Sequence, residues 1–382
     1  MTKLGIVAGE SSGDQLGAQL IEALRQYDPE IEIFGMCGPK MRAAGCQSLA
    51  DIEELSVMGL VEVLRKYPSL RKLRTRLTKD LIALDLDAFV GIDVPDFVHY
   101  IERQLKKQGV KTAHYVAPQV WAWRPNRAKK LAKTIEMLLV LFPFERDFFC
   151  DYGVDTRFVG HPLVKRIPEP VQRESACERL NLDPEKKYIA IMPGSRRQEL
   201  VRHCELFFEV AEQLGAVHGD YQFLVGAVHE GSREYIQQKL GAFNCRQRTT
   251  VVVGQSHEVL AVADVALVVS GTVTMEALVS KTPMVVAIRV AGLSYQILKR
   301  LVKTPYVAMP NVLARKAIVP EFVQDDATVD NLVSALNDWL TDGERNNEFY
   351  EQATALRASL SVTDQHTAAA AVHELLTVSD SA

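Results

Sequence analysis

The sequence predicts an α/β protein with two domains, each built on a mostly parallel sheet with helices on both faces. Three observations lead to this prediction. The chain has 382 residues, which is enough for two domains of ordinary size. Short apolar runs alternate with longer segments of helical period, a pattern typical of parallel sheets. A Pro-rich stretch at 167–170 divides these segments into two series, so we expect one sheet on either side of it.

The predicted strands of the first domain are short apolar runs, each followed by a segment of helical period. They cover residues 4–8, 31–34, 88–92, 112–116, 137–142 and 156–159. We place this domain at residues 1–165. Ligands of open α/β sheets bind beyond the carboxyl ends of the strands, so with two such domains we expect the site in the cleft between them.

The second series of apolar runs predicts a second α/β domain at residues 166–345. Its strands are expected at 188–192, 221–225, 250–253, 265–269 and 284–288. The remaining segment, 346–382, contains four alanines at 368–371 followed by V-H-E-L-L. Strong helix formers with this spacing predict an amphipathic C-terminal helix.

Composition excludes several classes of protein. Charged residues make up 24% of the chain and the net charge is −4, which argues against a general nucleic-acid binder. The six cysteines form no C-x-x-C pair and no zinc-site spacing, so we expect reduced thiols in a cytosolic protein and no metal. The N-terminus lacks the long apolar stretch and cleavage site of a signal peptide, and no run reaches 18 apolar residues, so we expect neither a signal peptide nor a membrane-spanning helix. Contact with a membrane surface stays open.

The first strand runs into a glycine-containing turn, G-E-S-S-G-D at 9–14, and then a helix. Such a turn lets a ligand approach the backbone closely, and Glu10 and Ser11 are candidates to meet it. The alternative is that Ser11 and Ser12 only cap the helix. The turn is not G-x-G-x-x-G, and no acidic residue ends the second strand, which argues against a dinucleotide enzyme.

A carboxylate, Asp93, directly follows the fully apolar run 88–92. A carboxylate at such a strand end is held rigidly and partly desolvated, which suits a general base for a sugar hydroxyl. The alternative is an N-cap for the helix that follows, a role that Asp96 suits better.

The loop after the fourth strand carries Gln119, Trp121 and Trp123. Two tryptophans beside Gln could stack on a sugar ring and bind its hydroxyls. Packing between the domains explains them equally well.

Two turns of the second domain suit phosphate. Residues 193–197 follow a predicted strand with a tight turn that exposes backbone amides, followed by a guanidinium, and residues 270–272 lie at the start of a helix. Either turn alone could be an ordinary connection between a strand and a helix. Two such turns in one domain favour a nucleotide-sugar site. The predicted phosphate-binding residues are Gly194, Ser195, Arg196, Ser270, Gly271 and Thr272.

Two further polar residues of the second domain are candidates for donor binding. Glu276, four residues beyond Thr272, could accept hydrogen bonds from both ribose hydroxyls. Asn311 lies in the irregular stretch P-Y-V-A-M-P-N, where turn formation is the alternative role.

An apolar and basic segment at 55–79 could meet acyl chains and anionic headgroups. The alternative is a buried half-helix with a solvated cationic face. Its apolar candidates are Val57, Met58 and Leu60, and its cationic candidates are Arg65, Lys66, Arg71 and Lys72.

Together these segments resemble the lipid-A-disaccharide synthase family. The motifs that carry the resemblance are V-A-G-E-S-S-G-D at 7–14, S-V-M-G at 56–59, V-G-I-D-V-P-D-F at 90–97, W-A-W-R at 121–124, P-G-S-R at 193–196, S-G-T-V-T-M-E at 270–276 and P-Y-V-A-M-P-N at 305–311. Family functional positions match at Glu10, Asp93, Arg196 and Asn311. Ser11 stands where Ala is common, and Val273 and Thr274 replace an expected small pair.

The resemblance implies a GT-B fold, two Rossmann-like domains facing across a cleft, with the C-terminal helix packing back on the first domain. It implies that UDP-2,3-diacylglucosamine and 2,3-diacylglucosamine 1-phosphate give a β-1′,6-linked disaccharide phosphate and UDP, without a cofactor. It further implies a cytoplasmic enzyme bound peripherally to the inner membrane of a Gram-negative bacterium, and it leaves room for a homodimer.

The resemblance also implies a mechanism, with Asp93 as the base and the phosphate turns stabilising the leaving UDP. The rival functions are another GT-B enzyme, such as a UDP-N-acetylglucosamine epimerase, a non-catalytic nucleotide-sugar-binding protein, and a dehydrogenase. The absence of G-x-G-x-x-G and the presence of Asp93 argue against the last two.

Overall fold

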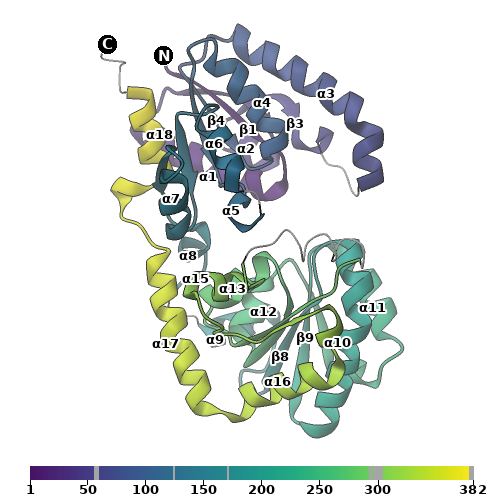
Figure 1. The fold of residues 1–382 in the computed structure, drawn as a ribbon. Coiled ribbons are helices and arrows are strands. Elements are labelled where there is room, and N and C mark those ends of the chain that lie inside the picture. The colour runs from purple at the N-terminus through teal and green to yellow at the C-terminus, as the bar shows by residue number, and fades with distance from the viewer. Residues whose placement is uncertain (56–59, 124, 170–171, 292–294, 296–303, 378–382) are drawn as a thin grey trace. The chain divides into compact units, whose positions relative to one another are not determined.

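The computed structural model divides the chain into two compact units (Figure 1). It describes residues 1–382 except 56–59, 124, 170–171, 292–294, 296–303 and 378–382. The first unit contains Met1–Pro162 and Leu360–Ala382, and the second contains Leu163–Ser359. The chain therefore enters the second unit near the predicted boundary and returns to the first unit for its last helix.

The first unit contains a seven-stranded sheet of order β3-β2-β1-β4-β5-β6-β7, in which all neighbouring strands are parallel. The order reverses between β1 and β4, which pair from Leu4↔Ala88 to Ala8↔Ile92. This reversal is the topological switch point, where open α/β sheets bind ligands. The strands are β1 Lys3–Ala8, β2 Glu32–Cys37, β3 Gln47–Asp51, β4 Ala88–Ile92, β5 Lys111–Tyr115, β6 Met137–Val140 and β7 Asp155–Phe158.

Helices cover both faces of this sheet because its strand residues alternate between two apolar cores. Leu4 and Ile6 face the core formed with α1 and the C-terminal helix α18, whereas Val7 faces the core formed with α3 and α4. The helices of this unit are α1 Ser11–Tyr27, α2 Pro39–Ala43, α3 Leu60–Ala83, α4 Pro95–Lys106, α5 Val120–Trp123, α6 Ala128–Leu131, α7 Pro143–Cys150 and α18 Ala368–Thr377.

The C-terminal helix α18 is an integral part of the first unit. Ala369 and Val372 are buried in the same core as Leu20 and Leu24 of α1. Polar contacts add to this packing, since Lys111 donates a hydrogen bond to the carbonyl of Leu375, and Arg157 and Glu374 form an ion pair. The predicted segment 346–382 is therefore divided, because the residues before Leu360 belong to the second unit.

The second unit contains a six-stranded parallel sheet of order β10-β9-β8-β11-β12-β13. Its switch point lies between β8 and β11, which pair from Val265↔Ile189 to Val268↔Met192. The strands are β8 Lys187–Met192, β9 Tyr221–Ala227, β10 Thr249–Val253, β11 Val265–Val269, β12 Met284–Ile288 and β13 Glu321–Val323. The helices are α9 Arg173–Leu180, α10 Arg197–Val217, α11 Glu230–Leu240, α12 Ser256–Val262, α13 Thr272–Val279, α15 Met309–Ala314, α16 Val329–Thr341 and α17 Gly343–Ser359, and α8 spans Pro162–Arg166.

Helix α17 is anchored in the second unit by one buried cation. Arg357 donates hydrogen bonds to the carbonyls of Val164, Ile167 and Val279 and forms an ion pair with Glu169. Buried carbonyls need a hydrogen-bond donor, and Arg357 supplies it to all three. These contacts therefore join α17 to residues 164–169 and to the end of α13.

The predicted fold class is confirmed, and so is every predicted strand, with shifts of at most three residues at the ends. The prediction missed β3 and β13, which are edge strands of the two sheets. Among the described residues, no helix is long and apolar enough to cross a bilayer.

Candidate functional site

The backbone at the end of β4 is unusual. Asp93 and Val94 both have left-handed conformations, with φ of 55° and 42°. This conformation costs roughly 1–2 kcal/mol for a residue other than glycine, and such strain clusters at functional sites. The N–H of Asp93 donates to the carbonyl of Tyr115 at 2.9 Å, and the Asp93 carboxylate accepts the N–H of Val94 at 2.8 Å. The half-buried carboxylate is thus fixed, with its second oxygen unengaged by any described residue.

The turn after β1 lies beside this carboxylate. Because Ala8 pairs with Ile92, Gly9 and Asp93 follow neighbouring strand ends. Gly9 is required here, since a Cβ atom on it would lie 2.3 Å from Cγ2 of Val94. The structure therefore brings the predicted residues Glu10 and Asp93 to the same switch point.

Glu10 occupies the N-cap of α1, and its side chain makes no capping hydrogen bond. Ser11 and Ser12 are the first two residues of the helix, so the alternative that they cap it is wrong. The side chains of Glu10 and Ser11 are exposed and available to a ligand.

The acidic residue of the same motif, Asp14, has a structural role. Its buried carboxylate accepts hydrogen bonds from the backbone N–H groups of Gly38, Lys40 and Met41, at 2.8 to 3.1 Å. It thereby satisfies the free donors at the start of α2. Sequence reasoning did not assign this role.

The tryptophan loop is held within the first unit. The indole N–H of Trp121 donates to Glu145 at 3.2 Å, and the ring packs edge-on against Phe144 at 4.9 Å. Gln119 is exposed. The side chain of Trp123 lies outside the described residues. Sugar binding by this loop stays a prediction.

Sequence reasoning missed Glu145, a buried carboxyl at the start of α7. Burial raises the pKa of Glu145 to about 8, although hydrogen bonds from Trp121 and from the N–H of Phe142 oppose the shift. The carboxyl therefore holds its proton near neutral pH. Its position, two residues after Pro143, is a helix-start signal that could have drawn attention to it.

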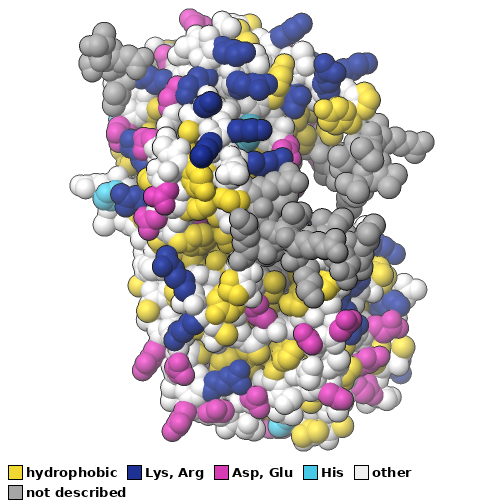
Figure 2. All heavy atoms as spheres, viewed as in Figure 1, with side chains coloured by type: hydrophobic (Ala, Val, Ile, Leu, Met, Phe, Trp, Pro, Cys, Tyr) yellow, Lys and Arg dark blue, Asp and Glu magenta, His cyan; other side chains and the backbone are white. Residues whose placement is uncertain are grey.

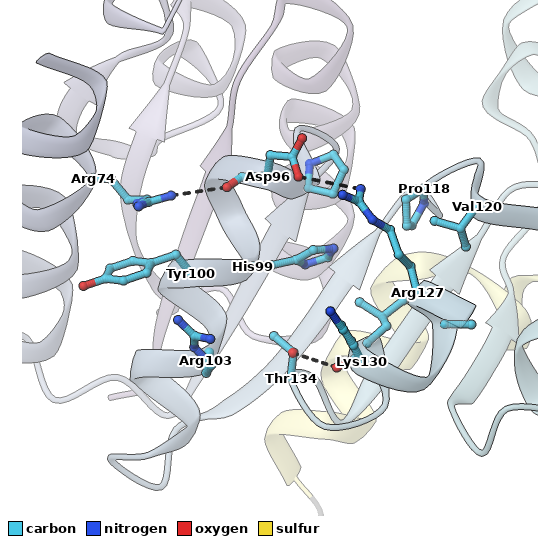
Figure 3. A pocket seen from close by; sticks show the side chains of 13 residues that line it. Arg74, Asp96, His99, Tyr100, Arg103, Pro118, Val120, Arg127, Lys130 and Thr134 are labelled. Carbon is cyan, nitrogen blue, oxygen red and sulfur yellow. Dashed lines mark hydrogen bonds and ion pairs between the residues drawn. The ribbon is translucent and has the colours of Figure 1, made fainter. Parts of the chain in front are cut away.

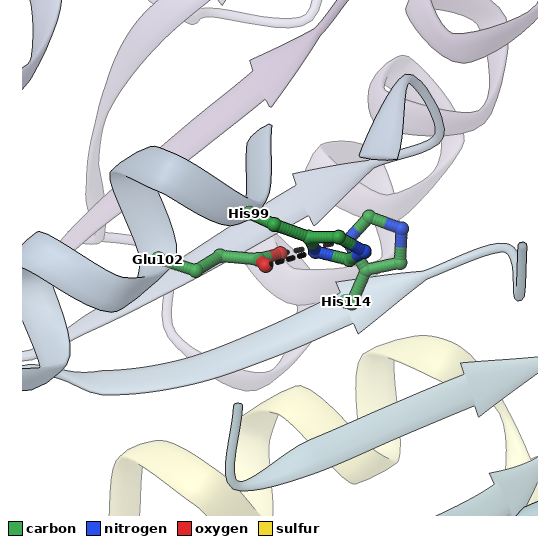
Figure 4. Close-up of side chains that lie close together, drawn as sticks. All are labelled: His99, Glu102 and His114. Carbon is green, nitrogen blue, oxygen red and sulfur yellow. Dashed lines mark hydrogen bonds and ion pairs between the residues drawn. The ribbon is translucent and has the colours of Figure 1, made fainter. Parts of the chain in front are cut away.

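Two histidines share one buried carboxylate in the first unit (Figure 4). Nδ1 of His99 and Nδ1 of His114 each lie 2.6 Å from a different oxygen of Glu102. Burial would raise the pKa of Glu102, but the two imidazoles outweigh burial and lower it. These three residues are close enough to hold a metal ion, but an ion would have to displace both hydrogen bonds. We assign Glu102 the role of orienting His99.

The turn after β8 is closed by its own helix. The N–H groups of Ser195 and Arg196 donate to the carboxylate of Glu199, at 2.8 and 3.1 Å. The prediction that this turn presents free amides is therefore wrong for these two residues. The Arg196 side chain remains 78% exposed and contacts Glu199 only at 3.5 Å, so its guanidinium is accessible.

The turn after β11 does present free amides. Gly271 is the N-cap of α13, and no described residue accepts hydrogen bonds from the N–H groups of Thr272 and Val273. The hydroxyl of Ser270 donates to the carbonyl of Val307 at 2.7 Å. Because Val268 pairs with Met192, this helix start and the turn at Arg196 follow neighbouring strand ends.

Glu276 is engaged within the second unit. Arg166 donates to it at 3.1 Å, and Nδ1 of His257 lies 3.8 Å away. Burial lowers the pKa of His257, so Arg166 is the principal charge partner. Ribose binding by Glu276 stays a prediction that requires sharing this carboxylate with Arg166.

Asn311 is engaged within its own loop. It is fully buried, its amide N–H₂ donates to Val319 and Glu321, and its oxygen accepts from Ile318 and Val319. Both donors and both acceptor positions are therefore used. In this structure the Asn311 amide therefore holds its own loop in place, and donor binding by Asn311 stays a prediction.

The apolar and basic segment is only partly described. Val57 and Met58 lie outside the described residues, as do the side chains of Leu60, Arg65 and Lys66. Arg71 and Lys72 are exposed on α3. On the face shown in Figure 2, Lys and Arg side chains gather over the first unit.

Comparison with known proteins identifies the relatives of this chain. A model of the lipid-A-disaccharide synthetase family matches residues 4–374. The lipid-A-disaccharide synthase of Pseudomonas paraeruginosa is 46% identical over 349 residues, covering 91% of this chain and 92% of that protein. The synthase of Azotobacter vinelandii is 43% identical over 374 residues and 98% of both chains.

Solved structures show the same fold at low sequence identity. A UDP-GlcNAc 2-epimerase from Neisseria meningitidis, bound to UDP-GlcNAc, matches 98% of each chain with a TM-score of 0.62 and 11% identity. A glycotransferase of kitacinnamycin matches 98% of each chain with a TM-score of 0.63 and 16% identity. The fold is therefore GT-B.

Proposed function

The chain belongs to the lipid-A-disaccharide synthase family, and from this premise we propose how its residues join UDP-2,3-diacylglucosamine to 2,3-diacylglucosamine 1-phosphate. The products are the β-1′,6-linked disaccharide phosphate and UDP. The observation that carries the assignment of residues is the strained backbone that fixes Asp93 at the switch point of the first unit.

Asp93 acts as the general base. The acceptor's 6-hydroxyl oxygen forms a bond to the anomeric carbon of the donor, and Asp93 takes the hydroxyl proton. Because the turn holds one carboxylate oxygen on the N–H of Val94, the other points to a defined place. Holding the base in this way favours proton transfer in the transition state. The exposed carboxylate of Glu10, from the neighbouring strand end, binds an acceptor hydroxyl.

The second unit stabilises the leaving group. As the bond between the anomeric carbon and the UDP oxygen breaks, its electron pair leaves with UDP and charge grows on the diphosphate. The free N–H groups of Thr272 and Val273, at the start of α13, and the exposed guanidinium of Arg196 stabilise this charge. Attack opposite the leaving group inverts the anomeric configuration.

Asp93→Asn tests the assignment. Asparagine tolerates the left-handed conformation and can still accept the N–H of Val94, so we expect an intact fold. Loss of a general base lowers kcat by about 10²–10⁴-fold. UDP release and disaccharide formation from the two diacylated glucosamines are measured together.

Asp85→Asn is the matched control. Asp85 has a similar left-handed φ of 52°, but it lies before β4, at the opposite end of the strand from Asp93. We expect turnover close to that of the unsubstituted chain. Near-normal turnover in Asp93→Asn would contradict the assignment of the base.

The membrane surface is the proposed place of this reaction, since both substrates carry acyl chains. We place the enzyme in the cytoplasm, bound peripherally to the inner membrane of a Gram-negative bacterium, with Arg71 and Lys72 on the contacting surface. Sedimentation with anionic vesicles should fall in the Arg71→Gln, Lys72→Gln double variant. Unchanged sedimentation of the double variant would refute the role of Arg71 and Lys72.

A homodimer is also compatible with the family. Light scattering of the unsubstituted protein distinguishes a monomer from a homodimer.

A further inference from the structure

A cavity of about 420 Å³ lies in the first unit, lined by residues of α3, α4 and the region around α6 (Figure 3). We call it the basic cavity. Side chains of α3 and α4 reach it from one side, and those of residues 127–134 from the other. Its charged residues are Arg74, Asp96, Arg103, Arg127 and Lys130, and His99, Tyr100 and Thr134 also line it.

The lining of the basic cavity is strongly cationic in a chain that is slightly acidic overall. It contains four Lys or Arg residues and one carboxylate, whereas the whole chain has 44 Lys and Arg against 48 Asp and Glu. The carboxylate, Asp96, is 97% exposed and lies 4.0 Å from Arg127. Because solvent surrounds it, it reduces the positive charge of the cavity only slightly. The concentration of positive charge favours an anionic ligand.

Two of these cations are arranged around one aromatic ring. The guanidinium of Arg74 lies 4.2 Å from the centre of the Tyr100 ring, and that of Arg103 lies 5.8 Å from it. Arg74 also donates to the carbonyl of Asp96 at 3.3 Å, and its Nε is buried without a hydrogen-bond partner. Guanidinium groups held in fixed orientations suit the oxygens of a phosphate.

His99 adds an oriented nitrogen to the same cavity. Its Nδ1 lies 2.6 Å from Glu102, and its side chain is 28% exposed at the cavity wall. Because Nδ1 is bound to the carboxylate, Nε2 is the atom left for a ligand. His114, on the other oxygen of Glu102, keeps this carboxylate in place from β5.

The basic cavity lies close to the proposed base. Pro95 and Asp96 line it, and Pro95 follows Asp93 by two residues. The two Cα atoms are therefore at most about 7.6 Å apart, since each peptide step spans 3.8 Å. A sugar whose hydroxyl meets Asp93 can thus place a phosphate on the far side of its ring in or near the cavity.

We propose that the basic cavity binds a phosphate monoester and that, during the reaction, it holds the 1-phosphate of the acceptor. The second part rests on the proposed function. The volume suits a sugar phosphate, and the cavity offers cationic donors to its phosphate oxygens. Acceptor recognition is thereby separated from the donor phosphates, which the second unit holds.

The test compares two double variants of the full chain that remove equal charge. Arg103→Gln with Lys130→Gln removes two cations of the cavity. Lys107→Gln with Lys129→Gln removes two exposed cations from the same part of the first unit, outside the cavity. Glucosamine 1-phosphate, which lacks acyl chains, is the binding probe in calorimetry at fixed salt, with inorganic phosphate as a second probe.

We expect the cavity variant to bind glucosamine 1-phosphate about 10–100-fold more weakly, because it loses two hydrogen bonds from exposed cations that solvent partly screens, and the control variant to bind it normally. In turnover assays the acceptor KM should rise by a similar factor, with the donor KM and kcat little changed. This probe binding does not require turnover. A chain that binds the probe but makes no disaccharide would refute the proposed function and leave the cavity assignment standing.

Sedimentation with anionic phosphatidylglycerol vesicles separates the acceptor phosphate from a lipid headgroup. We expect both double variants to sediment equally. If vesicle binding falls only in the cavity variant while probe binding and acceptor KM are unchanged, the cavity is a headgroup site and the proposal is overturned. Equal weakening of probe binding in both variants would also overturn it, because it would show an unspecific effect of surface charge.

Discussion

The buried carboxyl of Glu145 should make the stability of the first unit depend on pH in a direction opposite to that of most acidic residues. Burial raises its pKa to about 8 in the folded chain, from an ordinary value near 4.5. Between these values the folded state holds a proton that the unfolded state has released. Unfolding therefore releases a proton, and stability falls as the pH rises through this window.

The size of the effect follows from the shift. At pH 5 the unfolded carboxyl is mostly ionised and the folded one is protonated, and at pH 8 the folded one is half ionised. At 1.36 kcal/mol per pH unit, Glu145 alone lowers the free energy of unfolding by about 3 kcal/mol between pH 5 and pH 8. Above pH 8 the contribution levels off.

Glu145→Gln removes the titration and keeps an oxygen that accepts one hydrogen bond, from Trp121 or from the N–H of Phe142. Both proteins carry Trp339→Phe, so the remaining tryptophans, at 121 and 123, report only on the first unit. Urea unfolding is followed by their fluorescence at pH 5 and at pH 8. The glutamine variant should lose about 3 kcal/mol less than the parent between the two pH values. Equal losses in the two proteins would refute the reasoning, because other titrating groups are common to both.

Three further predictions concern stability. Asp14→Ala leaves three amides at the start of α2 without an acceptor, so we expect it to lower the free energy of unfolding in urea by about 3 kcal/mol. Asp14→Asn keeps an acceptor oxygen and should lower it less. Equal losses in the two variants would contradict the hydrogen-bond explanation. Arg357→Met leaves three buried carbonyls unpaired, so we expect a loss of about 3 kcal/mol, and a thermal midpoint within 1 °C of the parent would rule this out. In Gly194→Ala, the backbone φ of 124° is strained for alanine, and the new Cβ would lie 2.4 Å from Cβ of Glu199. Gly254→Ala is the control, because its φ is also positive but its Cβ would meet open space. We expect Gly194→Ala to destabilise the protein by about 2 kcal/mol more than Gly254→Ala does. Similar thermal midpoints for the two alanine variants would disprove the clash.

Strands inside the two sheets were predictable because their burial leaves continuous apolar runs. Residues 88–92 and 265–269 match β4 and β11 residue for residue. The missed strands are edge strands, where one side faces solvent and the apolar signal is weaker. Strand β3 has the sequence Q-S-L-A-D, and β13 has only three residues.

Candidate site residues could be predicted from the sequence only where a reactive side chain directly follows a predicted strand. Asp93 was identified because a carboxylate follows a fully apolar run, but its left-handed backbone depends on tertiary contacts that sequence does not show. The buried position of Asn311 was not predicted, because an exposed ligand-binding residue and a buried residue that holds a loop have the same sequence pattern. The basic cavity was not predicted, since its cations come from helices separated in sequence, and only their packing brings them together.

The route of the chain sets the order in which it can fold during synthesis. The second unit is continuous from Leu163 to Ser359, whereas the first needs Leu360–Ala382 to complete its core. A ribosome making 5–20 residues per second takes roughly 10–40 s to cover the intervening ~200 residues. During that time the α1 surface that later packs against α18 is uncovered. The N-terminal unit, made first, is therefore finished last, and its exposed apolar surface is a natural target for chaperones until the final helix emerges.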